Sequence, residues 1–281
     1  MFFRLVTWEI ALLLFGVLLG ATAVGVLLGR RVRHLSDSLK EPFGILQGAL
    51  LGVVGLLLAF GLSLAVNRYE DRRANLITVA NAIGTTHLRA QTLPEPIRSR
   101  SLDLLVSYTS NAIEVSNHIP GSAQANAAEV AEQRIQRQLW ALASEALERA
   151  PTASAPRLYV ETLNEMFDAE TARVAALGNR VPNAVLALAV LGSAIALGLL
   201  AAYLAIAGRG VVAVVLASAL VAFLLLVTAD LDRPTRGMIR VPDTVLANQL
   251  ATMTLPPAAA GPSARARPGT TTASSALSAS T

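Results

Sequence analysis

The pattern of apolar and polar positions divides the chain into four uninterrupted apolar stretches and one long polar segment. The apolar stretches cover residues 10–29, 43–66, 184–207 and 211–229, which are 20, 24, 24 and 19 residues long, and none contains Asp, Glu, Lys, Arg or His. The hydrocarbon core of a bilayer requires about 20 apolar residues per helix. The pattern therefore predicts an all-α integral membrane protein with four transmembrane helices.

The spacing of the stretches predicts two hairpins. Residues 30–42 join the first two stretches and residues 208–210 join the last two, and connections this short place consecutive helices antiparallel. Both termini and the polar segment then lie on one face of the membrane. A count of all Lys and Arg residues near the ends of the spans places this face in the cytoplasm. A count restricted to the short loops slightly favours the opposite orientation. We predict a multi-pass inner-membrane protein with cytoplasmic termini and a cytosolic insert.

The polar segment, residues 67–182, has a helical pattern throughout. Residues 67–91 continue the second span as one long helix, which ends before Pro94 and Pro96. Residues 97–118, 123–149 and 156–177 form three further amphipathic helices, with apolar stripes that include Leu105, Tyr108 and Met166. The pattern predicts a helical bundle beside the membrane.

The predicted domain division follows from these elements. Residues 1–66 form the first hairpin, 67–182 the insert, 183–229 the second hairpin, 230–255 a juxtamembrane segment and 256–281 a tail. The tail is rich in Pro, Ala, Ser and Thr, a composition that cannot bury a core, so we expect it to be disordered. We expect the first span to be retained, because it is too long for a secretory signal and ends in Arg residues.

Composition narrows the class of function. The chain is 53% apolar with a mean hydropathy of +0.53 and a net charge of +4. The absence of Cys excludes disulfides and thiolate chemistry. His34, His87 and His118 lie in unrelated segments, and the acid pair Glu129 and Glu132 is interpreted as a solvated helix face. No phosphate-binding or nucleophile motif is present, so we predict no enzyme activity, no cofactor and no nucleic-acid partner.

Small residues recur at every fourth position in the first hairpin. They are Gly16, Gly20, Ala21, Gly25 and Gly29 in the first span, and Gly44, Gly48 and Gly52 in the second. Such spacing lets helix backbones approach closely in lipid. We predict that these stripes pack the two spans against each other or against further copies of the chain in a homo-oligomer.

Three arginines, Arg68, Arg72 and Arg73, follow the second span. One interpretation is a border helix whose arginines reach lipid headgroups. The other is a cationic vestibule, in which a ring of subunits would concentrate anions. The spans themselves contain no ionisable residue, whereas many coupled carriers keep one at the bilayer midplane. This favours a passive pathway, or no pathway, over coupled transport.

Two acids, Asp230 and Asp232, close the fourth span. Two carboxylates could contribute to a cation site, but hard cations such as calcium require more oxygen ligands than two side chains supply. A local ion pair with Arg233 or Arg236 is therefore the favoured interpretation.

Several motifs resemble the bestrophin-like domain family, a bacterial and plant group of membrane proteins. They are Gln-Gly-Ala-Leu (47–50), Phe-Gly-Leu-Ser-Leu-Ala-Val-Asn-Arg-Tyr-Glu (60–70), Ala-Asn-Ala-Ile-Gly-Thr-Thr (80–86), Leu-Arg-Ala-Gln (88–91), Leu-Asn-Glu-Met (163–166) and Asp-Leu-Asp-Arg-Pro (230–234). Val79 and His87 depart from the residues expected in this family. The resemblance covers residues 47–241.

The family is distantly similar to bestrophins, which are pentameric anion channels whose second span lines a hydrophobic neck. The resemblance implies that Phe60 occupies the neck position nearest the polar exit, with Leu56 and Gly52 one and two turns earlier. The acidic run that binds calcium in animal bestrophins is reduced here to Asp230 and Asp232. Calcium gating is therefore not expected.

These observations predict an oligomeric membrane protein, a pentamer by resemblance, that contacts lipid and conducts small anions. The expected pore-lining residues are Gly52, Leu56 and Phe60, and the expected cytoplasmic vestibule contains Arg68, Arg72 and Arg73. The alternative is a non-conducting membrane sensor or scaffold whose helical insert binds a protein partner.

Overall fold

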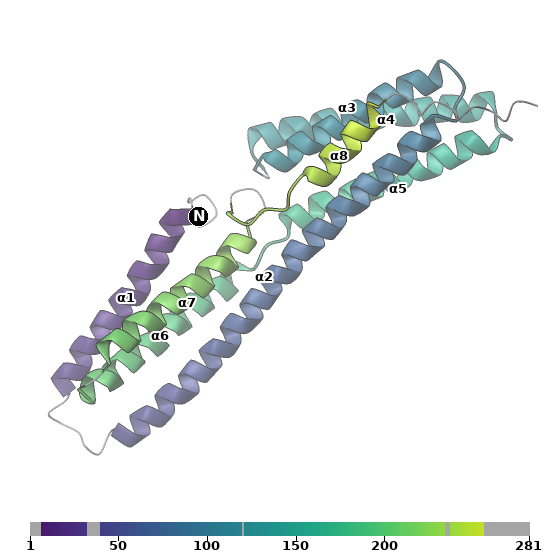
Figure 1. Ribbon diagram of the computed structural model, residues 1–281. Coiled ribbons are helices and arrows are strands. Elements are labelled where there is room, and N and C mark those ends of the chain that lie inside the picture. Colours follow the sequence, from purple (N-terminus) through teal and green to yellow (C-terminus); the bar gives the residue numbers. More distant parts are fainter. Residues whose placement is uncertain (1–6, 33–39, 120, 209, 234–236, 256–281) are drawn as a thin grey trace, which may run out of the picture.

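The computed structural model describes residues 7–32, 40–119, 121–208, 210–233 and 237–255, and these residues form helices and short connections without a strand (Figure 1). The helices are α1 (Thr7–Val32), α2 (Lys40–Ala90), α3 (Ile97–Asn117), α4 (Ala123–Arg149), α5 (Ser154–Gly178), α6 (Asn183–Ile206), α7 (Val211–Leu231) and α8 (Thr244–Met253). The predicted tail, residues 256–281, lies outside the described residues, as does Arg236.

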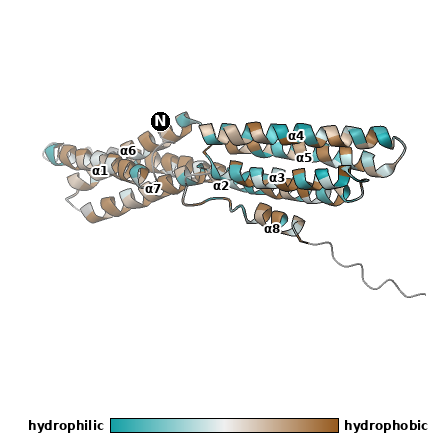
Figure 2. Cartoon of the chain, turned by 90° about the horizontal axis from the view of Figure 1, so that it is seen from above, coloured by the Kyte–Doolittle hydropathy of each residue, from teal (hydrophilic) through white to brown (hydrophobic). Residues whose placement is uncertain are grey.

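The molecule is elongated, with an apolar half and a more polar half (Figures 1 and 2). Helices α1, α6 and α7 and the first part of α2 make up the apolar half, and α3, α4, α5, α8 and the rest of α2 make up the polar half. Four helical segments are long and apolar enough to cross a membrane. They include the four stretches identified in the sequence except for one end residue in three of them, which confirms an all-helical protein with four candidate membrane spans.

Helix α2 connects the two halves. It has 51 residues, which corresponds to a length of about 77 Å at the rise of an α-helix. No proline interrupts it after its first turn, and it ends shortly before Pro94 and Pro96, which restrict the preceding backbone. The prediction that the second span continues through residues 67–91 as one helix is confirmed.

The polar half is a helical bundle with a continuous apolar core. Ile83, Tyr108, Leu139, Leu163 and Met166 are fully or almost fully buried in it. The predicted helices 97–118, 123–149 and 156–177 agree with α3, α4 and α5 to within two residues. The bundle thus forms as the apolar stripes of the sequence predict, because each helix buries its stripe against the others.

Helix α8 was not predicted. It packs against α2 and α3, and buries Leu246 and Met253 in the core of the bundle. The segment after the fourth span therefore returns to the insert and covers its core.

The glycine stripes do not pack the first span on the second. Among the described residues, α1 packs mainly against α6 and α7. A Cβ atom on Gly25 would lie 2.0 Å from the carbonyl oxygen of Gly198, and one on Gly29 would lie 2.4 Å from that of Ala202. The close backbone approach is therefore between α1 and α6, where these two glycines permit it.

The other predicted packing glycines are more open. Gly16, Gly20, Gly48 and Gly52 have no atom within 4 Å of an added Cβ, whereas Gly44 faces the ring of Tyr203 in α6. The prediction that these positions pack the two spans against each other is therefore wrong, and packing against other copies of the chain remains a prediction.

We expect Gly25→Ala to lower the free energy of unfolding by roughly 1–3 kcal/mol, because the added methyl group overlaps the α6 backbone. The matched change Gly16→Ala adds a methyl group into open space on the same helix and should cause no loss. Thermal unfolding in detergent, followed by circular dichroism, measures both. Equal destabilisation by the two changes would contradict the α1–α6 contact.

Candidate functional site

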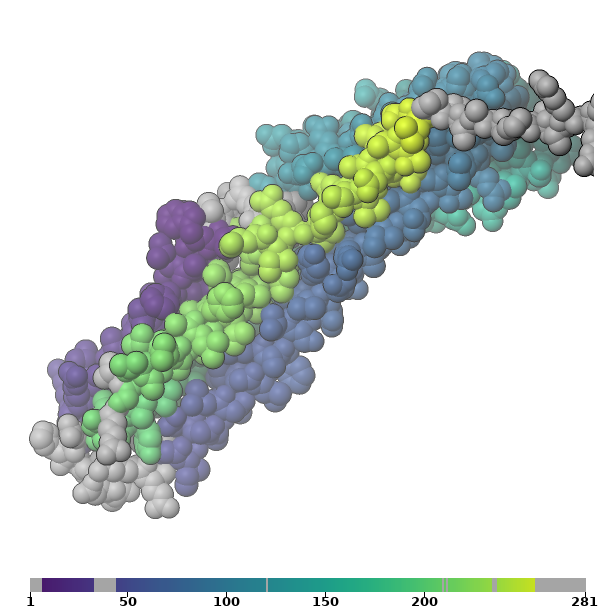
Figure 3. Space-filling model, viewed as in Figure 1, coloured from purple at the N-terminus to yellow at the C-terminus, as the bar shows by residue number. Residues whose placement is uncertain are grey.

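One face of α2 is left uncovered in the apolar half of the molecule. Gly52, Leu56 and Phe60 lie one turn apart on this face, and Leu56 and Phe60 are 58% and 64% exposed. Val54 and Leu58 on the opposite side are buried in the core of the apolar half. In the space-filling view α2 forms one edge of the molecule (Figure 3).

The character of this exposed face changes along the helix. The exposed residues up to Val66 are mostly apolar, whereas Asn67, Glu70 and Asp71 begin a polar section. This change coincides with the end of the apolar stretch 43–66, which is long enough to cross a bilayer. The predicted pore residues thus share one outward apolar face, which is available to lipid or to further copies of the chain.

The three arginines after the second span have different surroundings. Arg73 is exposed and its Nη1 lies 3.6 Å from Glu70 Oε2. The Arg68 side chain is 15% exposed, with Nη1 3.7 Å from Asp232 Oδ1. Arg72 is buried. The prediction that Arg72 lines a vestibule together with Arg68 and Arg73 is therefore wrong, because the buried Arg72 side chain is not available to line an opening.

Arg72 instead holds three backbone segments together. Its Nε donates to Ala176 O at 3.3 Å, its Nη1 to Leu231 O at 3.0 Å and its Nη2 to Asn179 O at 2.9 Å. These carbonyls lie at the ends of α5 and α7, where helices leave carbonyl groups without intrahelical donors. Nη2 also lies 3.8 Å from Asp232 Oδ1. We call Arg68, Arg72 and Asp232 the border clasp.

The two acids after the fourth span make structural contacts. Asp232 is fully buried and its Oδ1 accepts the N–H of Val181 at 2.9 Å. The Asp230 carboxylate accepts the N–H groups of Met238 and Ile239, both at 2.9 Å. The described residues contain no group of three or more acidic or His side chains arranged to hold a metal ion. Asp232 thus serves the border clasp, with partners on α2.

Burial and the neighbouring groups act on the pKa of Asp232 in opposite directions, and the net effect raises it. Burial raises the pKa of Asp232, while the N–H of Val181 and the positive charges of Arg72 and Arg68 act to lower it. An ion pair removed from water is stable only when its polar atoms have close partners. The clasp satisfies part of this requirement through backbone groups from two segments of the chain, residues 176–181 and Leu231, while Asp232 Oδ2 has no hydrogen-bond partner among the described residues.

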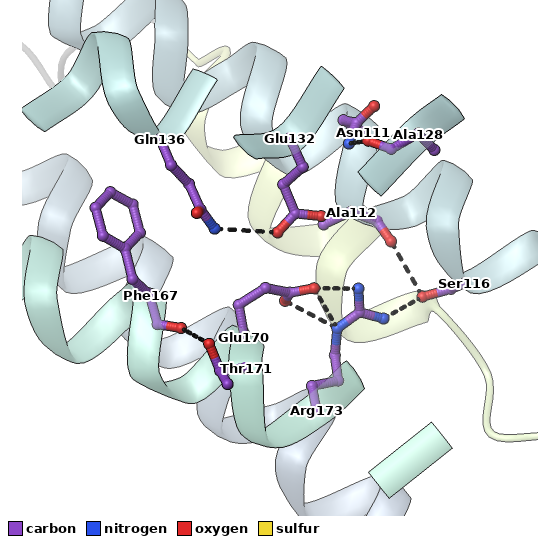
Figure 4. A network of polar contacts seen from close by, with 10 residues as sticks. All are labelled: Asn111, Ala112, Ser116, Ala128, Glu132, Gln136, Phe167, Glu170, Thr171 and Arg173. Atoms are coloured by element: carbon purple, nitrogen blue, oxygen red, sulfur yellow. Dashed lines mark hydrogen bonds and ion pairs between the residues drawn. The ribbon is translucent and has the colours of Figure 1, made fainter. Parts of the chain in front are cut away.

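The structure also contains a buried polar cluster that sequence analysis missed. Glu132 of α4 is 4% exposed and lies beside Glu170 and Arg173 of α5 (Figure 4). The interpretation of Glu132 as part of a solvated face is therefore wrong. A signal was present in the sequence, because Glu132 lies on the same helical stripe as Ala128 and Ile135, which are buried.

The four candidate spans and the helical bundle at their border define an all-helical integral membrane protein. The Bestrophin-like domain profile matches residues 13–246, and the chain therefore belongs to the bestrophin-like family. This confirms the resemblance found in the sequence.

Solved structures show the same fold. A bacterial bestrophin homologue from Klebsiella pneumoniae is similar to this chain with a TM-score of 0.61 and 16% identity, over 84% of this chain and 97% of that chain. A variant of that homologue, with one tyrosine replaced by alanine, has a TM-score of 0.60 at 17% identity, over 84% and 98% of the two chains. A comparison with curated protein sequences finds no match.

We expect Arg72→Lys to lower the free energy of unfolding by roughly 1–3 kcal/mol, because an ammonium group cannot reproduce the planar fork that reaches three carbonyls. The neighbouring change Arg73→Lys affects an exposed side chain and should leave stability unchanged. Thermal unfolding of the purified protein compares them. If the two variants unfold alike, Arg72 does not have the structural role assigned to it.

Proposed function

We propose that the protein is an oligomeric anion channel of the cell inner membrane, in which α2 helices from several copies surround the pathway. The observation that carries this proposal is the uncovered apolar face of α2, with Gly52, Leu56 and Phe60 one turn apart. In a ring of subunits these residues would form a passive, apolar constriction, which can gate by excluding water.

Packing within the chain supports this arrangement. The inner face of α2 is used by α6 and α7, while Gly48 and Gly52 on the outer face leave open space for close approach of another helix. The resemblance to bestrophins adds a ring of five subunits and a preference for anions. Lipid covers the remaining apolar surface.

The polar end of the pathway follows from the continuation of α2 into the insert. In this proposal the insert and both termini are cytoplasmic, and Arg68 and Arg73 lie at the cytoplasmic mouth. Arg73 pairs with Glu70 and Arg68 lies near Asp232, so neither arginine acts as an isolated positive charge. The anion preference in this proposal comes from the resemblance to bestrophins.

We expect the purified protein to conduct chloride in proteoliposomes and Phe60→Ala to increase the flux several-fold, because a bulky side chain is removed from the constriction. Phe223→Ala is the matched control, since Phe223 on α7 is 61% exposed, close to the 64% of Phe60. Chloride and potassium fluxes are measured in the same vesicles, and the oligomeric state is measured in detergent.

Several outcomes would overturn the proposal. Equal effects of the two phenylalanine changes on the flux would show that α2 does not line the pathway. A potassium flux above the chloride flux would contradict anion selectivity. Absence of flux from a monomeric or dimeric particle would favour the alternative class, a sensor or scaffold. In that class, deletion of the insert would abolish a protein interaction while the spans remain inserted.

A further inference from the structure

The buried polar cluster joins three helices of the insert. Glu132 comes from α4, Glu170 and Arg173 from α5, and Tyr108 from α3. All four are at most 4% exposed. Figure 4 shows Glu132 pointing toward the side of the Glu170–Arg173 pair, with Gln136 next to it.

The single cation of the cluster is used by one of the two acids. Arg173 Nε donates to both carboxylate oxygens of Glu170, at 3.1 and 2.9 Å, and Nη2 donates to Oε1 of the same group. Nη1 donates to Ser116 Oγ of α3 at 2.7 Å. The guanidinium fork is therefore committed to Glu170 and Ser116, and it balances one negative charge.

Glu132 lacks an equivalent partner. Its Oε1 accepts a long hydrogen bond from Gln136 Nε2 at 3.4 Å. Its Oε2 and the Tyr108 hydroxyl are buried, and neither makes a hydrogen bond of good geometry among the described residues, although the two groups are near enough for the Tyr108 hydroxyl to lower the pKa of Glu132. An ionised carboxylate in this position would be a buried, poorly solvated negative charge, which is strongly unfavourable.

The surrounding charges do not compensate for it. The groups that influence Glu132 electrostatically are Glu170 and Arg173 from α5, Tyr108 from α3, and Glu129 from α4 itself. Asp243, which precedes α8, lies in the field of Arg173. Glu132, Glu170 and Glu129 thus share one neighbourhood with a single arginine, so an additional positive charge is favoured at this place.

A small cavity gives solvent access to the cluster. It has a volume of about 190 Å³ and is lined by Glu129, Glu132, Gln136, Glu170 and Thr171, together with Gln133 and Val174. Protons can therefore exchange between the cluster and water without opening of the bundle.

We propose that this cluster is a proton-binding site, with the proton carried by Glu132, and that the bound proton holds α3, α4 and α5 together. The neutral carboxyl gains an O–H donor, for which the Glu170 carboxylate is a neighbouring acceptor, while its other oxygen can accept from the Tyr108 hydroxyl. The bound proton thereby supplies the positive charge that the cluster lacks. A metal ion would need three acidic or His ligands, and the described residues contain no such group.

The acid–base properties of the site agree with this geometry. Burial, with the negative charge of Glu170 as the second cause, raises the pKa of Glu132 to about 7. Burial also raises the pKa of Tyr108 well above its ordinary value, so the phenol stays neutral. Because the folded protein holds the proton more tightly than the unfolded chain, stability is highest below the unfolded pKa of Glu. It falls as the pH rises toward about 7, and changes little above that.

The proton site lies close to the border clasp along α5. Arg173 lies three residues before Ala176, whose carbonyl oxygen accepts from Arg72 of the border clasp. A change in the packing of α5 at the proton site is thus transmitted over less than one helical turn to the contact that holds α2.

The test compares the full-length protein with Glu132→Gln, which has the shape and neutral charge of the protonated side chain. At about pH 5 the two should melt at the same temperature, and at about pH 8 the variant should melt higher. The unfolding equilibrium constant of the natural protein should increase tenfold or more over this range, on the order expected from a pKa shift of more than one unit. Glu148→Gln, an exposed change on the same helix, should follow the natural protein.

Infrared difference spectra between the same two pH values test for the proton itself. The natural protein should lose the stretch of a protonated carboxyl group as the pH rises, and Glu132→Gln should lack this change. Tyr108→Phe keeps the ring but removes the hydroxyl group, whose hydrogen bonding lowers the pKa of Glu132, and should therefore raise the pH at which the band disappears. This second variant provides the test if Glu132→Gln does not fold.

Three results would overturn the proposal. The first is an unchanged carboxyl band in Glu132→Gln, which would place the proton on another group. The second is a carboxyl band of Glu132 that disappears at the pH at which an ordinary glutamate ionises. The third is a melting temperature at about pH 8 that sodium, potassium or calcium ions raise in the natural protein but not in Glu132→Gln, which would make the ligand a metal cation.

Discussion

The contact of Arg72 with the ends of α5 and α7 connects the apolar half of this protein to its polar half. Helix ends present carbonyl groups that their own helix cannot satisfy, and a guanidinium group has enough donors to serve several of them at once. Arg72 serves three such carbonyls while Asp232 provides the opposing charge. A long helix with no bend thus acquires a fixed position relative to the segments around it.

The exposed face of α2 is a consequence of how the other spans pack. Gly25 and Gly29 allow α1 to approach α6 closely, and α1 occupies that position instead of covering α2. The inner face of α2 is buried through residues such as Val54 and Leu58. Its outer face is then free for contact between copies, which is the physical basis for the proposed pathway.

The buried acids of the insert and of the border clasp differ in how their negative charge is balanced. In the border clasp, the N–H of Val181 and two arginines lie beside Asp232, so charge is balanced by fixed groups of the fold. Around Glu132 the fixed groups leave an excess of negative charge. The border clasp contacts the end of α5 through the carbonyl of Ala176, and the proposed proton site lies shortly before that contact on the same helix.

Local pattern alone determined the four spans, the continuation of α2 and the insert helices, because apolar run length and helical periodicity report directly on burial. The resemblance to a family was also contained in the sequence. Only the tertiary structure showed that Arg72 is buried while Arg73 is exposed, and that Gly25 is closely packed while Gly16 is open. Such residues have the same type and similar places in the sequence pattern, and they differ only in which helix lies opposite them. The burial of Glu132 was decided in the same way, by α3 and α5 closing over a stripe that α4 alone would leave in water.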